Sequence, residues 1–133
     1  MHMDLMKKLN YKGQHHVFLL NKPASLSLNI EEKGFAGVIA DQWDGVESEG
    51  LFLIFVFSQD EIHHWAEVLL PVISPKALLW LAYPKLSSKL YHSDVSRDRG
   101  WNPFTQKGWR PVRQIAIDED WSSLRFRPNS NLS

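Results

Sequence analysis

The strongest structural signals in the chain lie in LFLIFVFSQDEIHHWAEVLLPVISPKALLWLAY, residues 51–83. It begins with seven apolar residues, 51–57, and ends with a second apolar run, 77–83. Runs without polar alternation are typical of strands that are covered on both faces. Between them, Ser58 and Glu61 form a Ser-x-x-Glu capping box. The helix that follows is indicated by apolar residues at helical spacing, namely Ile62, Trp65, Ala66, Leu69 and Ile73, and Pro71 is expected to end or bend it.

Shorter elements are predicted on both sides of this strand–helix–strand unit. We expect strands at residues 16–20, 35–40 and 111–117, and an antiparallel return at 121–127 after the turn at 118–120. Short helices are expected around Leu5, Met6 and Leu9, and at NPFTQKG with Asn102 as its cap.

Residues 23–34 carry signals for two different structures. Pro23 at the start and Gly34 at the end favour a helix. The alternation of Ala24, Leu26, Leu28 and Ile30 favours a strand. We predict a helix here and keep the strand as the alternative.

The predicted strands alternate with helices, and two of the strands are apolar throughout. This pattern predicts an α/β fold. The expected architecture is a three-layer Rossmann-like sandwich, with a mostly parallel sheet of about five to six strands and an antiparallel C-terminal hairpin strand. We predict a single domain over 1–133, with an N-terminal helix and turn at 1–13 and a flexible tail at 128–133.

Composition excludes several classes of protein. The 133 residues include no cysteine, so neither a disulfide nor a thiolate metal site is available. No apolar run approaches the roughly 20 residues of a membrane span, and no secretory signal precedes the first turn. We therefore predict a soluble, cytoplasmic protein without a membrane partner. Net charge is zero, although residues 1–75 carry a net charge of −5 and residues 76–133 one of +5.

Ligands of open α/β sheets bind beyond the carboxyl ends of the strands. A dinucleotide or S-adenosylmethionine site there needs a glycine-rich first loop, which lets the backbone approach the cofactor. The first loop here reads NKPAS and has no glycine, although Asp41 ends the second strand, where an acid can accept from ribose hydroxyls. We therefore predict no cofactor, and treat Asp41 as a candidate ligand contact.

The loop AYPKLSSKLYHSDVSRD, residues 82–98, follows the fourth predicted strand. It offers Lys85, Ser87, Ser88 and Lys89 for holding a phosphate or another anion, although loops are polar in any case. Trp43, Trp101 and Trp109 lie in or beside loops and are candidates for a binding surface.

The histidines do not predict a metal site. Two adjacent pairs, at residues 15–16 and 63–64, are poorly placed to chelate one ion, and no His-Glu-x-x-His occurs. A nucleic-acid partner is not predicted either, because net charge is neutral and no aromatic-basic strand signature is present.

The second half of the chain resembles a bacterial family named domain of unknown function 3052. The resemblance rests on Tyr83-Pro84-Lys85, Asp94-Val95-Ser96-Arg97, Gly108 with Pro111-Val112, and Asp118 with Trp121-Ser122, Leu124, Arg125 and Phe126. It covers about residues 50–127 and implies a small Rossmann-like fold, without implying an activity or a cofactor.

Our functional prediction is a non-catalytic module that binds a small anionic ligand or a protein partner at the carboxyl edge of the sheet. Lys85, Asp94 and Arg97 join the candidate contacts, because a Pro-Lys at a strand end followed by an Asp…Arg pair suits a ligand-facing loop. The alternatives are a degenerate methyltransferase-like or phosphate-ester-handling enzyme, in which Asp41, Lys85, Asp94 and Arg97 converge, and a protein that self-associates through its loop tryptophans.

Overall fold

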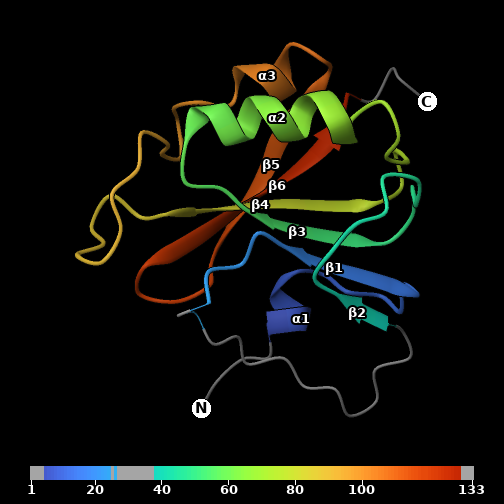
Figure 1. Ribbon diagram of the computed structural model, residues 1–133, viewed down its shortest axis with the longest axis horizontal. Helices are drawn as coiled ribbons and strands as arrows, with labels where there is room; N and C mark the ends of the chain where they lie inside the picture. The colour runs from blue at the N-terminus through green and yellow to red at the C-terminus, as the bar shows by residue number, and fades with distance from the viewer. Residues whose placement is uncertain (1–4, 25, 27–37, 130–133) are drawn as a thin grey trace.

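A single six-stranded sheet organises the computed structural model, which describes residues 5–24, 26 and 38–129 (Figure 1). The elements in chain order are α1 (Leu5–Lys8), β1 (His16–Leu20), β2 (Val38–Ala40), β3 (Leu51–Phe55), α2 (Gln59–Leu69), β4 (Leu78–Pro84), α3 (Asn102–Thr105), β5 (Trp109–Ala116) and β6 (Trp121–Pro128).

The strand order across the sheet is β2-β1-β3-β4-β6-β5. The first four strands are parallel, with Leu51 of β3 opposite both Val17 and Leu78. β6 is inserted antiparallel between β4 and β5, so that it pairs with both. β2 and β5 are therefore the two edges of the sheet.

The predicted three-layer Rossmann-like sandwich is wrong, because the fold is mostly sheet. Among the described residues there are three helices, of four, eleven and four residues. A parallel crossover needs a dozen or more residues, usually a helix, whereas β5 and β6 are joined by a short turn and form a long antiparallel portion instead. Figure 1 shows α2 and α3 on one side of the sheet and the single turn of α1 on the other.

Two apolar clusters cover the two faces of the sheet. The side with α2 and α3 contains Phe52, Ile62, Leu81 and Phe126, all fully buried. The side with α1 contains Trp80 and Trp121 among its buried residues. The indole Nε1 of Trp80 donates to the Leu9 carbonyl oxygen at 3.0 Å, which attaches the N-terminal segment to the sheet.

The strand–helix–strand interpretation of residues 51–83 is confirmed. Ser58 is the N-cap of α2, and its hydroxyl accepts from the Glu61 backbone N–H at 3.2 Å. The Glu61 carboxylate reaches back to the Phe57 N–H, one residue earlier than in the standard capping box. The helix ends at Leu69, two residues before Pro71.

Other expectations differ from the structure or fall outside it. Trp101, not Asn102, is the N-cap residue of α3, and it makes no side-chain capping bond. Most of the ambiguous segment 23–34, residues 35–37 of the predicted second strand, and residues 130–133 of the predicted tail lie outside the described residues. Within the part of the chain that the structure covers, no helix has the length and apolarity to cross a membrane.

Gly50 provides a test of the β1–β3 junction. Its φ is +129°, and a Cβ added there would lie 2.7 Å from the His16 carbonyl oxygen. Gly45 has a φ of +80° with nothing within 4 Å of such a Cβ. We expect Gly50→Ala to lower the free energy of unfolding by on the order of 3 kcal/mol, and the control Gly45→Ala by about 1 kcal/mol. Urea unfolding measures both; equal losses would contradict the close packing of the junction.

Candidate functional site

A cavity of about 550 Å³ lies at the carboxyl end of β4 and beside the β5–β6 hairpin. Its cationic and hydroxyl groups come from the loop after β4, which supplies Lys85, Ser87 and Arg97. Its floor is built from neighbouring strands, by Tyr83 of β4, Gln114 of β5 and Ser122 of β6. We call this the Lys85–Arg97 cavity.

Tyr83 is held in place by its neighbours. Its hydroxyl accepts from the Gln114 side-chain amide at 3.1 Å, and its ring packs edge-on against Trp101. Burial raises the pKa of the Tyr83 hydroxyl, while a hydrogen bond with Ser122 and the charge of Arg97 act in the opposite direction. The phenol therefore stays protonated at neutral pH and is not a general base.

Positive charge dominates the polar lining of the Lys85–Arg97 cavity. Among the described residues, no Asp or Glu lines it, while Lys85 and Arg97 both do. The Lys85 backbone N–H donates to the Asp120 carbonyl at 2.8 Å, which fixes the start of the loop to the β5–β6 turn. Arg97 forms an ion pair with Asp98 at 3.5 Å, but both side chains are largely exposed. Such a pair contributes little, so the guanidinium is available to an incoming anion.

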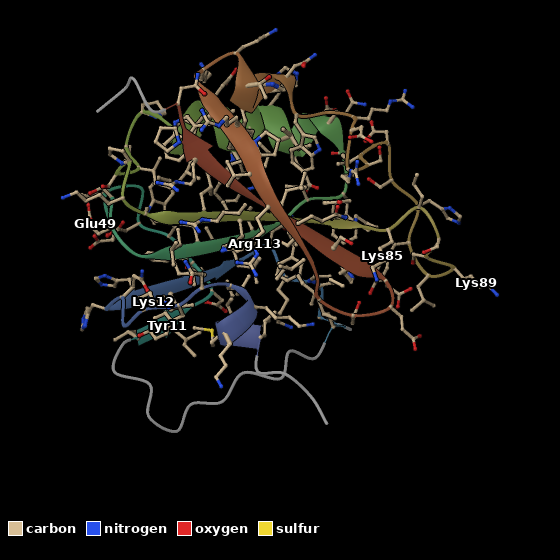
Figure 2. All side chains as sticks on the ribbon, turned by 180° about the vertical axis from the view of Figure 1, so that it is seen from behind. Tyr11, Lys12, Glu49, Lys85, Lys89 and Arg113 are labelled. Carbon is tan, nitrogen blue, oxygen red and sulfur yellow. The ribbon has the colours of Figure 1, made fainter. Side chains whose placement is uncertain are left out.

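The structure brings Lys85, Ser87 and Arg97 together, but not the other candidates on this loop. Ser88 is buried, and its hydroxyl donates to the Asp120 carboxylate at 2.8 Å and accepts from the N–H groups of Leu90 and Tyr91. Lys89 does not line the cavity, and Figure 2 shows its ammonium pointing outward from the far part of the loop. Ser88 shapes the loop instead of facing a ligand.

Asp94 supports a helix. Its carboxylate accepts from the backbone N–H of Gln59, the first residue of α2, at 2.9 Å, and the Gln59 side chain donates back to the Asp94 carbonyl. A carboxylate at this position satisfies an unpaired N–H and complements the positive end of the helix dipole. The sequence indicated Asp94 as a candidate ligand contact, whereas the structure shows it bonded to the start of α2.

Asp41 lies at a second cavity, of about 680 Å³, beyond the ends of β1 and β2. Asn21 and Lys22 line it as well, and it shares no lining residue with the Lys85–Arg97 cavity. The predicted convergence of Asp41, Lys85, Asp94 and Arg97 in one closed pocket is therefore wrong.

Asn21 occupies the point where the strand order reverses, between β1 and β3. Its backbone is left-handed, with a φ of +61°. Its side-chain amide donates to the Phe55 carbonyl at 2.7 Å and to the Glu61 carboxylate at 2.9 Å. Ligands of open α/β sheets enter at this crevice, and here the chain's own amide bridges it. A ligand of the second cavity would lie on the β2 side of Asn21.

Several other expectations concern residues outside these cavities. The described residues contain no cluster of three or more His, Asp or Glu side chains that could hold a metal ion. Asp118 accepts from the N–H groups of Asp120 and Trp121, as expected of a turn residue.

The loop tryptophans offer little surface for self-association. Trp101 and Trp109 are buried, with exposed fractions of 5% and 6%. Trp43 is half-buried and bonded to the Glu47 carbonyl.

Sequence reasoning missed the strand residues that complete the Lys85–Arg97 cavity: Tyr83, Gln114 and Ser122. Tyr83 closes an apolar run and was expected only as core. Gln114 and Ser122 lie 31 and 39 positions from Tyr83 along the chain, and nothing in either segment signals the pairing that brings them to it. The one signal available for Gln114 and Ser122 was the alternation of side chains between the two faces of β5 and β6.

Comparisons with known proteins show similarity of fold. No family model matches the chain, and no curated protein matches it. Among solved structures, a complex of LepI with SAM is 11% identical with a TM-score of 0.54, and covers 94% of this chain. A LepI variant in complex with SAH and a substrate analogue is also 11% identical, with a TM-score of 0.52 and the same coverage. The chain spans 39% of the length of the LepI chains, and this likeness concerns the fold alone.

The free energy of unfolding provides a test of whether Asp94 caps α2. We expect Asp94→Ala to reduce the free energy of unfolding by about 1 kcal/mol, because the Gln59 N–H loses its acceptor. Asp98→Ala, four residues later on the same loop, removes only an exposed ion pair and should change stability little. Urea unfolding followed by circular dichroism compares the two. Equal stability of the two variants would show that Asp94 does not support α2.

Proposed function

We propose that this chain is a small module that binds an anionic ligand, a phosphate or carboxylate compound, in the Lys85–Arg97 cavity. The observation that carries the proposal is a pair of cations on a cavity that no carboxylate lines in the described part of the chain. Ser87 and Gln114 add neutral hydrogen-bonding groups, and Leu86 and Ile115 add apolar surface for the rest of a small molecule. Its volume is within the usual range for small-molecule sites, about 300–1,000 Å³.

Binding, instead of catalysis, suits the groups around this cavity. Within residues 5–24, 26 and 38–129, no His, Asp or Glu lines it, and burial keeps the Tyr83 hydroxyl protonated by raising its pKa. The guanidinium of Arg97 can hold two oxygens of one phosphate or carboxylate in its planar fork, whereas Lys85 supplies a point charge. The lining thus provides recognition and charge compensation, without a general base.

Thermal shift with defined anions tests the proposal. We expect inorganic phosphate, AMP or glucose 6-phosphate at millimolar concentration to raise the Tm of the protein, because a ligand at about 100 times its Kd stabilises the folded state by about 2.7 kcal/mol. The double variant Lys85→Gln/Arg97→Gln should lose the shift while its Tm without ligand stays near that of the wild type.

The matched control neutralises two exposed lysines elsewhere, Lys76→Gln/Lys107→Gln, and should keep the full shift. If none of these anions raises the Tm, or if the control loses the shift as completely as the cavity variant, the Lys85–Arg97 cavity is not the site.

A second candidate function is a degenerate methyltransferase-like domain that binds SAM at the cavity beside Asp41. The supporting observations are the similarity in fold to LepI complexes with SAM and SAH, and the position of Asp41 directly after β2. A carboxylate there can accept from ribose hydroxyls. The absence of glycine from the first loop and the bridge made by Asn21 weigh against it, so we rank it second.

Titration calorimetry with SAM and SAH tests this second candidate. If it holds, SAM binds, and Asp41→Ala weakens binding by about tenfold, the loss expected for a hydrogen bond to a charged group. Asp98→Ala serves as the control, because it removes an exposed acid outside this cavity. No heat of binding with either compound would remove the candidate.

Membership of the family named domain of unknown function 3052 stays a proposal. Some of the residues that carry the resemblance have structural roles, and others line the candidate site. Trp121, Leu124 and Phe126 are buried in the core, and Asp94 caps α2. Lys85, Arg97 and Ser122 line the Lys85–Arg97 cavity.

A further inference from the structure

Four arginines lie on one side of the β5–β6 hairpin. The register places Arg110 opposite Arg127 and Arg113 opposite Arg125. Arg125 is also opposite Trp80, which belongs to the apolar cluster on the α1 side of the sheet. The four guanidinium groups therefore share the side of the hairpin that faces away from α2 and α3, and we call this surface the arginine face (Arg110, Arg113, Arg125 and Arg127).

The arginine face has no acidic partner among the described residues. Ion pairs in that part of the chain join His16 to Glu47 and Arg97 to Asp98, and neither involves this face. The Nε of Arg125 is buried without a hydrogen-bond partner. Lys8 adds a further positive charge nearby, since its ammonium donates to the Ala116 carbonyl at the end of β5.

This arrangement costs stability. Like charges directly opposite each other on neighbouring strands are destabilising, and here two such pairs follow one another. Burial lowers the pKa of the Arg125 guanidinium, and the charges of Arg127 and Arg113 lower it further. The lowering by Arg127 and Arg113 reflects repulsion between neighbouring cations on this face. An anion held between them would remove the repulsion.

Protection of an edge strand explains only part of this pattern. β5 is an edge of the sheet, and Arg110, Arg113, Pro111 and the irregular register between Pro111 and Arg113 are features that discourage pairing with another chain. β6, however, is an interior strand that is paired on both sides. Arg125 and Arg127 therefore protect no edge, and they need a different explanation.

We propose that the arginine face binds the phosphate backbone of a nucleic-acid duplex. Its two arginine pairs are two residues apart along β6, or about 7 Å, and present four planar forks suited to phosphate oxygens. Figure 2 labels Arg113 near the centre of the view, beside the strands of the hairpin.

The surroundings favour a duplex over the other polyanions. The Phe, Tyr and Trp side chains among the described residues are all buried or half-buried, so they form a poor stacking platform for single strands. A membrane surface would call for exposed apolar anchors beside the cations. On the hairpin the one large apolar side chain that is exposed is Val112. The site differs from the Lys85–Arg97 cavity, because Gln114 and Ser122 of that cavity face the other side of the hairpin, and only Ile115 of its lining shares the side of Arg113.

Fluorescence anisotropy with a short labelled DNA duplex, repeated across salt concentrations, tests the proposal. We expect binding at low salt, with a log–log slope of about −0.9 for each phosphate that is neutralised. Arg113→Gln and Arg127→Gln should each weaken binding by about tenfold and reduce the slope by about 1. Two duplexes of unrelated sequence should bind equally, because phosphate contacts carry no sequence information.

The control is Arg99→Gln, an exposed arginine on the α2 side of the molecule, beside Gln59 and His63. This variant also removes one positive charge, and it should bind DNA with the same affinity as the wild type. The Tm of Arg113→Gln and Arg127→Gln should be equal to or above that of the wild type, because a like-charge pair is removed. A loss of binding without a loss of stability separates recognition from folding.

Three results would overturn the proposal. The first is no DNA binding at low salt, together with self-association of Arg113→Gln by light scattering, which would assign the arginines to edge protection alone. The second is DNA binding that Arg99→Gln or Lys85→Gln/Arg97→Gln abolishes while the arginine-face variants retain it. The third is arginine-dependent binding to vesicles of anionic lipid without binding to the duplex.

Discussion

The pairing of β6 with β4 joins the parallel half of the sheet to the antiparallel hairpin. Six residues of β4, from Leu79 to Pro84, lie opposite Phe126 to Trp121 in an antiparallel ladder. This ladder makes β6 an interior strand and moves β5 to the edge of the sheet. It also gives one hairpin two different surfaces, because successive side chains of a strand point to opposite faces. Ser122 and Gln114 line a cavity on one face, and Arg125 and Arg113 lie on the other.

The loop between β4 and α3 supplies the charged residues of the candidate site. Lys85 is fixed to Asp120 in the β5–β6 turn, Ser88 bonds to the Asp120 carboxylate, and Asp94 bonds to the first N–H of α2. The loop is thus attached to two separate elements, and Lys85 and Arg97 come to line one cavity. Polar residues that looked equivalent in the sequence therefore divide into those that hold the loop and those that face a ligand.

Sequence reasoning was accurate where local chemistry decides the outcome. The apolar runs became β3 and β4, and Ser58 caps α2 as its spacing predicted. The three-layer sandwich failed because helix layers depend on how long the connections are and which strands they join. The closed pocket of Asp41, Lys85, Asp94 and Arg97 failed for a similar reason, since β1 and β3 lie between β2 and β4 and keep Asp41 apart from the loop after β4. Distances between such residues follow from strand order, which no short segment encodes.

Caps, turns and apolar runs act over a few neighbouring residues, so the strands, the main helix and the loop that carries the candidate cations could be predicted from the sequence. Which charges meet depends instead on the pairing of distant strands. Net charge is zero, and on that ground a nucleic-acid partner was not predicted, yet strand pairing places Arg110 and Arg113 opposite Arg127 and Arg125. Local charge density depends on the register between strands, and backbone hydrogen bonds and the burial of Leu124 and Phe126 set that register at the expense of repulsion between the arginines.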